Sequence, residues 1–460
     1  MSFLGIELND AGITGVSDAG IAFSEPGCAL LDDQGVVFGS AAQQAASRFP
    51  RAFHDRYWLS LSDEPLVAGS GDVQTCADLV HAQLAQLWEV TANDVSQVAY
   101  AVPSYWSRDQ LALLLGISQE LGIPLKGLVE IPVAATRRPY PGYELLNIET
   151  GMHLTGISHM HSEVSEIQYA LDTVADTGVV ALRRTCAEYF ARRFLECCRF
   201  DPLHDAESEQ GVYDLMDEWL AALGQSATTD VRMNYKGNEY SAVLDAASLS
   251  SLLRRCCQAL IQSLRSVVSI DQPTALQIDA HLASYPGVID MLLELPGCDV
   301  FVLEPGAAAR GLLARHKNLL DNGSSTEAGC SLSVSLPFDQ PPAEAAEKVV
   351  SAIINRSPTH LLYAGVAYRL GALAFHIGTE PDKNGYGVLV SSSHTGVSRQ
   401  HCSIELSGGH VRLNDHSRFG TLLNGCKLKG SAILQTGDLV SVGDPACDFQ
   451  LIAEAGPDGA

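Results

Sequence analysis

The chain has 460 residues, of which 46% are hydrophobic and 18% charged, and its formal net charge is −25. This length predicts two or three domains with cores of their own, and the composition excludes a disordered chain. The acidic excess argues against nucleic acid as a partner, because like charges would repel.

No part of the sequence has the pattern expected for export or membrane insertion. The first residues lack a basic segment followed by an apolar core, and no apolar run approaches the roughly 20 residues that cross a bilayer. Twelve cysteines occur without any Cys-x-x-Cys spacing, and Cys197 with Cys198, like Cys256 with Cys257, forms an adjacent pair in a helical pattern. We therefore expect buried thiols in a cytoplasmic protein.

The first 270 residues alternate strand and helix patterns. Residues 1–40 alternate apolar and polar side chains with glycine breaks, which predicts strands joined by hairpins. The next elements are predicted in this order: short helix 41–47, helix 76–88, buried strand 96–103, helix 110–121, strand 125–130, helical segment 132–135, strands within 145–173, helix 179–198, hairpin 229–242 and helix 246–267. Alternating strands and helices indicate an α/β architecture, and the opening hairpins indicate mixed sheets.

Several stretches occur in the order in which the actin-like ATPase fold has them. They are 5–8, 39–42, 101–110, the hairpin 229–235 with the helical stretch 244–264, and 304–311. Residues 1–320 therefore resemble the nucleotide-binding domain of DnaK-type heat-shock chaperones, without the client-binding sandwich and lid of that family. The resemblance implies a two-lobed fold with ATP between the lobes, on two glycine-rich hairpins and an adenosine-binding turn.

The residues at these nucleotide positions depart from the family pattern. The first hairpin reads Glu7-Leu8-Asn9-Asp10 where the family has Asp-x-Gly-Thr, and the second reads Asn147-Ile148-Glu149-Thr150-Gly151 where it has Asp-x-Gly-Gly-Gly. The adenosine turn, at 279–286, has lost its glycines. A carboxylate about 4 Å from a phosphate charge is repelled by roughly 4 kcal/mol at an effective dielectric near 20. We interpret Glu7, Asn9, Asp10, Asn147, Glu149 and Gly151 as vestigial positions of a pseudo-ATPase head that has no cofactor.

Residual nucleotide binding is the alternative for this head. ATP and Mg²⁺ would then be the cofactors and the protein an ATPase, with Glu7 as the carboxylate that could organise the metal. No catalytic order of Ser, His and Asp and no metal-ligand spacing occurs, so no catalytic residue and no metal site is assigned. His153, His159 and His161 recur at strand spacing, which is more typical of partly buried side chains than of metal ligands.

The composition changes at about residue 321. Loop-forming residues fill 321–329 and 339–344, and apolar residues at helical spacing predict one short helix at 344–355. From residue 358, short alternating segments between Gly, Asn and Asp turns predict a small all-β sandwich. We therefore expect a first domain at 1–320, a linker at 321–357, a second domain at 358–455 and a tail at 456–460.

Three motifs characterise the expected sandwich. They are Ser398-Arg399-Gln400-His401, then Gly420-Thr421 with Asn424-Gly425, and finally Gly437-Asp438. The region resembles a forkhead-associated (FHA) domain, a module that binds phosphothreonine in partner proteins. The resemblance assigns phosphate contact to Ser398, support of its loop to His401, and structural roles to Gly378, Gly420 and Gly425.

Two of the three ligand-reading positions differ from the FHA pattern. Thr379 stands where the family has arginine, and Phe419 where it has asparagine. A charge-assisted hydrogen bond contributes about 1.5–3 kcal/mol, so loss of the arginine alone would weaken phosphate binding roughly ten- to a hundredfold. Arg399 and Arg418 either replace that cation or are ordinary surface residues. The candidate peptide-binding residues are Ser398, Arg399, Arg418, Phe419, Thr421 and Asn424.

Three functions remain open from the sequence. The favoured one is a non-catalytic scaffold or regulator that binds partners through a pseudo-ATPase head and a phosphate-independent FHA module. The second is an adaptor for phosphothreonine-containing partners in Ser/Thr kinase signalling. The third is a DnaK-type ATPase or chaperone with altered nucleotide loops. All three predict protein partners, and none predicts nucleic acid or membrane insertion.

Overall fold

The computed structural model describes residues 2–452 except 33–34, 72, 92–94, 162–163, 269–271, 323–330, 344–357, 372, 381–385, 392–393, 408–409, 429, 435 and 437. The chain forms two compact units. The first comprises Met1–Cys256, Ala275–Ile289 and Val300–Val349, and the second comprises Cys257–Thr274, Asp290–Asp299 and Val350–Ala460. Two segments of the expected 1–320 domain, 257–274 and 290–299, thus group with the C-terminal residues.

A six-stranded mixed sheet forms one part of the first unit, in the order β18-β10-β9-β1-β2-β3. Its strands are β1 (Phe3–Glu7), β2 (Ile13–Ser17), β3 (Gly20–Glu25), β9 (Gln97–Val102), β10 (Leu125–Glu130) and β18 (Ser331–Ser333). β1 pairs antiparallel with β2 and parallel with β9, so that Gly5 lies opposite Val16 and Ala99. A Cβ at Gly5 would come within 2.4 Å of the Ala309 carbonyl oxygen, so glycine lets a helix pack closely on this strand.

A second six-stranded sheet has the order β17-β16-β11-β12-β13-β19. Its strands are β11 (Glu144–Thr150), β12 (Leu154–Met160), β13 (Ser165–Ala175), β16 (Thr274–Ile278), β17 (Cys298–Val302) and β19 (Ser335–Leu336). Smaller sheets are formed by β4 (Ala29–Asp32), β5 (Gly35–Phe38) and β6 (Phe53–His54), by β7 (Pro65–Ser70) and β8 (Val73–Thr75), and by β14 (Thr228–Tyr235) and β15 (Asn238–Asp245). The expected mixed sheets with helices are therefore confirmed.

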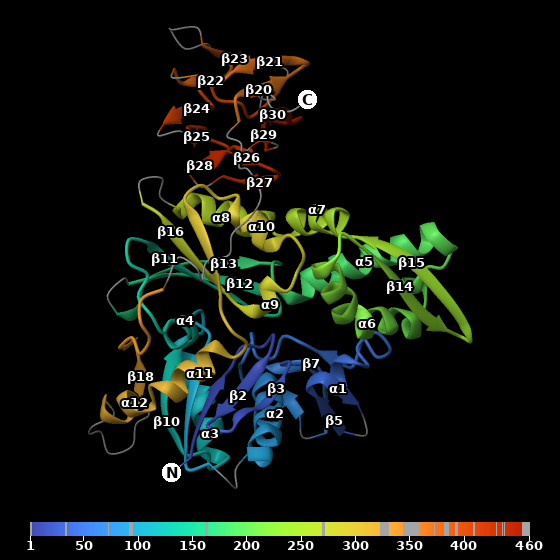
Figure 1. Cartoon of the computed structure of the whole chain (residues 1–460), viewed down its shortest axis with the longest axis vertical. Coiled ribbons are helices and arrows are strands. Elements are labelled where there is room, and N and C mark those ends of the chain that lie inside the picture. Colours follow the sequence, from blue (N-terminus) through green and yellow to red (C-terminus); the bar gives the residue numbers. More distant parts are fainter. Residues whose placement is uncertain are drawn as a thin grey trace. The chain divides into compact units, whose positions relative to one another are not determined.

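The helices alternate with these strands along the chain (Figure 1). They are α1 (Gly39–Gln43), α2 (Cys76–Thr91), α3 (Arg108–Glu120), α4 (Ile131–Ala135), α5 (Val179–Cys198), α6 (Ala206–Gln225), α7 (Ala246–Cys256), α8 (Gln258–Val267), α9 (Ala280–Ala283), α10 (Val288–Leu293), α11 (Ala307–Ala314) and α12 (His316–Asn322), with a short 3₁₀ helix at Pro202–His204. No described helix is long and apolar enough to cross a membrane.

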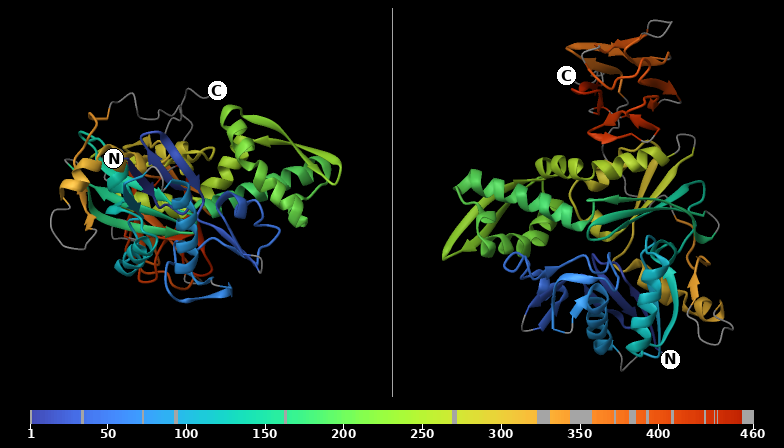
Figure 2. Two further views of the ribbon diagram at one scale, coloured as in Figure 1. Left: turned by 90° about the horizontal axis from the view of Figure 1, so that it is seen from below. Right: turned by 180° about the vertical axis from the view of Figure 1, so that it is seen from behind.

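Two features of this helix set differ from the sequence prediction. The single helix predicted at 246–267 is two helices, because the backbone leaves the helical region at Cys257, with φ −82° and ψ 5°. Helix α6 was not predicted, although Asp205 caps its first turn and its apolar residues recur at helical spacing. In both views, α5 and α6 lie along the hairpin β14–β15 (Figures 1 and 2).

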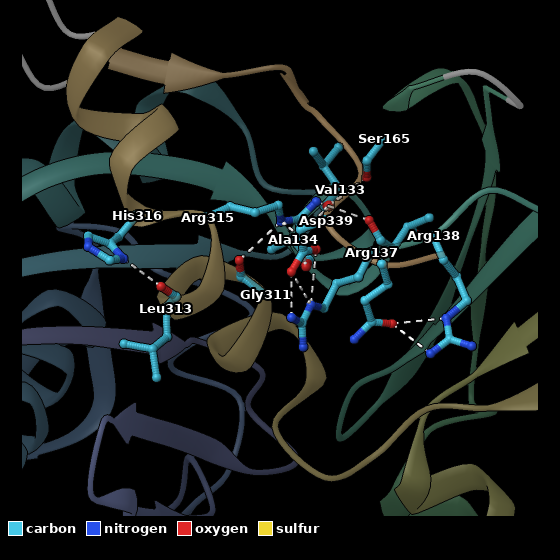
Figure 3. A network of polar contacts seen from close by, with 12 residues as sticks. Val133, Ala134, Arg137, Arg138, Ser165, Gly311, Leu313, Arg315, His316 and Asp339 are labelled. Carbon is cyan, nitrogen blue, oxygen red and sulfur yellow. Dashed lines mark hydrogen bonds and ion pairs between the residues drawn. The ribbon is translucent and has the colours of Figure 1, made fainter. Parts of the chain in front are cut away.

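A segment at 331–343 links the two large sheets of the first unit; we call it the strap. Its strand β18 extends the first sheet beside β10, and β19 extends the second beside β13. Arg137 and Arg138 bind Asp339 and Gln340 of the strap, and the buried Arg315 lies 3.8 Å from the same Asp339 carboxylate (Figure 3). Arg315 also donates to the carbonyl oxygens of four residues: Gly311, Val133, Ala134 and Thr136.

The C-terminal part of the second unit is an all-β sandwich, as expected. One sheet has the order β21-β20-β30-β29-β26-β27 and the other the order β23-β22-β24-β25-β28. The strands are β20 (His360–Tyr363), β21 (Val366–Arg369), β22 (Phe375–Gly378), β23 (Gly387–Leu389), β24 (Cys402–Ser407), β25 (His410–Asp415), β26 (Leu422–Leu423), β27 (Cys426–Lys427), β28 (Ser431–Leu434), β29 (Leu439–Val442) and β30 (Cys447–Ile452). Apolar residues of both sheets, including Phe375, Ile377 and Phe449, form one buried core.

Helix α8 packs against β27 and β28 of this sandwich. The Arg265 guanidinium lies 2.7 Å from the Asp438 carboxylate, and both side chains are less than 10% exposed. Gln262 donates to the Cys426 carbonyl oxygen at 3.2 Å. A buried ion pair therefore attaches the segment that contains α8 to the sandwich. The predicted helix at 344–355 and the tail at 456–460 lie outside the described residues.

Candidate functional site

A cleft of about 480 Å³ in the first unit contains most of the positions that the sequence suggested as vestigial nucleotide positions. Its lining includes Glu7 at the end of β1, Asn9 in the turn after it, and Asn147 and Glu149 on β11. Asp279, which follows β16, lines it as well. The structure thus brings together Glu7 and Asp279, which are 272 positions apart in sequence. Asp10 and Gly151 lie next to these residues and are buried.

The backbone amides of the two hairpin turns are bound by acceptors within the chain. Met152 N–H donates to Asp10 Oδ1 at 2.7 Å, and Thr150 N–H to Asp279 Oδ2 at 2.8 Å. In the same turns, Gly151 N–H donates to the Leu154 carbonyl at 2.9 Å, and Ala11 and Gly12 donate to Asn9. Two carboxylates therefore occupy donors that would otherwise be available to an anion.

Burial shifts the acid–base behaviour of the carboxylates in this cleft. Desolvation raises the pKa of Glu149 to about 8 and that of Glu7 to about 7, against hydrogen bonds from Ser104 and from Ala308 and Ala309 that favour the charged forms. The pKa of Asp10 is raised for the same reason, although Met152 donates to it. These carboxylates resist ionisation because burial removes them from water, which disfavours the charged form.

The residues present do not fit a magnesium nucleotide. Five turn amides already have acceptors, and the lining adds carboxylates where a polyphosphate would need cations or free N–H groups. The described part of the chain contains no group of three or more His, Cys, Asp or Glu residues arranged to hold a metal ion. His153 is placed beside Asp55, with Nε2 3.2 Å from the carboxylate.

A second candidate site is formed by loops at one end of the sandwich, around the fully buried ring of His401. Ser398 N–H donates to His401 Nδ1 at 3.0 Å, and His401 Nε2 lies 3.2 Å from the Gly420 carbonyl oxygen. Because Nδ1 accepts, Nε2 must carry the proton and the ring is neutral. Burial lowers the pKa of His401, which agrees with this assignment.

The loop at 415–421 is held by Asp415. Its carboxylate accepts hydrogen bonds from Ser417 N–H at 3.0 Å and from the Thr421 hydroxyl at 2.8 Å. Partial burial would raise the pKa of Asp415, but these donors lower it below its ordinary value. Gly420 has φ +99°, and a Cβ there would come within 2.3 Å of the Lys427 side chain, so the turn requires glycine.

The two loops meet at Ser398. Its Oγ accepts a hydrogen bond from Arg418 N–H at 3.3 Å, and its carbonyl oxygen accepts one from Thr379 N–H at 3.1 Å. Arg399 is 80% exposed, with Nε 3.5 Å from the exposed Glu380 carboxylate. The Arg418 guanidinium carbon lies 5.7 Å from the ring centre of Phe419, which is 65% exposed.

Two of the predicted peptide-binding residues form bonds within the sandwich. Thr421 is fully buried and bound to Asp415. Asn424 donates to Asp438 Oδ1 at 2.9 Å and accepts the Leu439 N–H at 2.7 Å. Arg399, Arg418 and Phe419 are exposed, and Ser398 is half-buried beside them. The exposed face of the site therefore presents one hydroxyl, two guanidinium groups and one aromatic ring.

Comparison with known proteins identifies the type of the sandwich. Residues 377–443 match the family model of the FHA domain. This confirms the FHA domain expected from the sequence over that stretch, and FHA domains bind phosphothreonine-containing protein partners. A search of curated proteins with the whole chain found no match. No family model supports the actin-like or DnaK-type resemblance of the N-terminal region.

Proposed function

We propose that the protein is an adaptor that binds phosphothreonine-containing partner proteins through residues 377–443. The observation that carries the proposal is the junction at Ser398, where its hydroxyl oxygen accepts the backbone N–H of Arg418 from the second loop. A single phosphate placed there can accept hydrogen bonds from the Ser398 hydroxyl on one loop and from a guanidinium on the other. The buried His401 holds the two loops together, because its ring contacts Ser398 N–H and the Gly420 carbonyl oxygen.

The chemistry of the ligand follows from these groups. A phosphate dianion is bound best by several charge-assisted donors on preorganised loops. The Thr379 side chain cannot supply the charge-assisted hydrogen bond to phosphate that the arginine of the family supplies. Arg418 and Arg399 supply it instead. Residues 358–460 have a net charge of −2, so capture depends on these local donors and not on a basic field. The comparison thus favours a phosphate-dependent adaptor over the phosphate-independent module that the sequence favoured.

Paired peptide titrations test this function. Pools of phosphothreonine peptides and of the same peptides without phosphate are titrated against the full chain. We expect binding of the phosphorylated pool only, weakened roughly ten- to a hundredfold by Arg418→Ala or Ser398→Ala. Arg369→Ala, which removes an exposed arginine of β21 outside the loops, is the matched control. Equal binding of both pools would overturn the proposal in favour of the phosphate-independent reading.

For the N-terminal region, we infer a non-catalytic, pseudo-ATPase head that serves protein contacts. The inference combines the actin-like resemblance of 1–320 with one observation, the occupation of the turn amides by Asp10 and Asp279. A nucleotide would have to displace both carboxylates and then lie beside the buried Glu149, which could avoid repelling the phosphates only by keeping its proton.

Thermal unfolding with and without MgATP tests the head. A ligand at a hundred times its Kd adds about 2.7 kcal/mol to the free energy of unfolding, which shifts the melting temperature measurably. We expect no shift in the transition of the first unit. A rise of several degrees would instead support the ATPase alternative.

A further inference from the structure

The cleft of the first unit contains a buried carboxylate oxygen that lacks a hydrogen-bond partner within the part of the chain that the structure describes. Glu149 is 3% exposed and lines the cleft. Its Oε2 accepts hydrogen bonds from Ser104, at 3.3 Å from N–H and 3.0 Å from the hydroxyl. Its Oε1 has no partner among the described residues. Because an unsatisfied buried polar atom costs free energy, this oxygen points to a missing donor.

The charges around this oxygen define what that donor can be. Five more carboxylates line the cleft: Glu7, Glu25, Asp217, Asp279 and Glu304. Among the described lining residues the one arginine is Arg183 and there is no lysine. Arg183 binds Asp217 at 2.6 Å and the Tyr213 carbonyl at 3.0 Å, so its guanidinium is already occupied. Asp217 is paired with Arg183 and Glu304 with Arg310, and the remaining acidic side chains of the lining make the cleft more favourable for a cation than for an anion.

The geometry distinguishes between kinds of cation. Glu7, Glu149 and Asp279 come from three different elements, and the described residues do not form a metal-binding group. An ammonium or guanidinium group has several N–H donors that can reach separate carboxylates without a common coordination centre. A cleft of about 480 Å³ also lies within the range of small-ligand sites.

We propose that this cleft binds an organic cation, whose ammonium or guanidinium group donates to Glu149 Oε1 beside Glu7 and Asp279. The source is either a free polyamine or a lysine or arginine side chain of a partner protein, since both present the same group. The proposal goes beyond the phosphothreonine function and does not depend on it, because the FHA domain lies in the other unit.

Proton release should accompany binding. The titratable groups around Glu149 are Glu7, Asp279 and the phenol of Tyr105. Because the pKa of Glu149 is raised to about 8, the bound cation must displace its proton at neutral pH. Affinity should therefore rise with pH through about 8.

Calorimetric titration of the full chain tests the proposal. Spermidine, a lysine- and arginine-containing peptide and MgCl₂ are titrated separately at near-physiological salt, in buffers of different ionisation enthalpy. We expect spermidine or the peptide to bind with proton release, and MgCl₂ not to reproduce this. Whichever of the two binds identifies the source of the cation. No binding by either, or equal binding of MgCl₂, would overturn the proposal.

A pair of variants separates the cleft from general attraction to an acidic protein. Glu149→Gln should weaken binding at least about tenfold, because it removes the charge that faces the ligand. Glu120→Gln, at a 74% exposed position outside the cleft lining, should leave binding unchanged. Equal weakening by both variants would overturn the proposal. If Glu149→Gln does not fold, the proton release measured with the wild-type protein tests the proposal instead. Binding of the cation without proton release would contradict a role for Glu149.

Discussion

At the scale of single residues, Thr379 stands where the FHA pattern has an arginine. Its N–H donates to the Ser398 carbonyl, so the backbone beside the serine that we propose to contact phosphate is in place without the family arginine. We expect Thr379→Arg to strengthen binding of a phosphothreonine peptide roughly ten- to a hundredfold, because it adds a charge-assisted donor. Fluorescence anisotropy with the phosphorylated peptide and its unphosphorylated twin measures this, and a gain for the unphosphorylated peptide would contradict it.

His401 makes the stability of the same site depend on pH. Its pKa is lowered by burial, so the unfolded state binds the proton more readily. The resulting stability is fully present above the ordinary histidine pKa of about 6.5 and is lost as pH falls below it. The melting temperature of the second unit should therefore fall from pH 7.5 to pH 5.5 by more in the wild type than in His401→Gln. Parallel curves for the two proteins would refute the role of this ring.

At the scale of elements, short segments join parts of each unit through arginines. In the first unit, the strap brings the Asp339 carboxylate to Arg137 and to the buried Arg315 (Figure 3). Burial lowers the pKa of Arg315 to about 10 even though Asp339 opposes the shift. The strap therefore contributes a counter-charge as well as two edge strands.

Removal of that counter-charge should destabilise the first unit. We expect Asp339→Asn to reduce its free energy of unfolding by about 1.5–3 kcal/mol, the contribution of hydrogen bonds to charged groups. Urea denaturation measures the change, and Asp18→Asn, at an exposed position, is the control. If both variants unfold at the same urea concentration as wild type, Asp339 does not hold the strap.

In the second unit, α8 depends on Arg265 in the same way. Its ion pair with Asp438 is buried on both sides, and Asp438 also accepts from Asn424, so the pair joins the helix to a structural turn of the FHA domain. We expect Arg265→Ala to destabilise the unit by about 3–5 kcal/mol, because a buried carboxylate loses its cation. Denaturation of Arg369→Ala, a control at an exposed position of the same unit, should match wild type. A change below about 1 kcal/mol would place this pair among weak surface ion pairs.

At the scale of the whole molecule, Glu149 and His401 give their units opposite dependences on pH. Glu149 favours the folded first unit below its ordinary pKa of about 4.5, and this contribution is lost as pH rises through about 8. The melting temperature of Glu149→Gln should thus increase relative to that of the wild type as pH rises. His401, in contrast, lowers the stability of the second unit as pH falls below its ordinary pKa. Differential scanning calorimetry across this range checks the sign, and a constant difference would contradict the raised pKa.

Much of this architecture is visible in the sequence because it depends on local periodicity. The strand patterns of 1–40, the helix at 179–198 and the alternating strands from 358 were all predicted from neighbouring residues. The FHA motifs could also be recognised from the sequence, because the turn glycines and the residues they orient lie within about fifty positions. Helix α6 also had a local signal, in Asp205 and its apolar spacing, that the prediction did not use.

By itself, the sequence determined most of the order of elements, the position of the FHA domain, and the presence of Thr379 and Phe419 where the family has Arg and Asn. These features depend on adjacent residues. Only the tertiary structure decided which donors and acceptors remain available. Asp279 takes the amide of Thr150 across 129 positions, and Arg265 reaches Asp438 across 173. Such pairs depend on how distant segments pack, a property that no local pattern encodes.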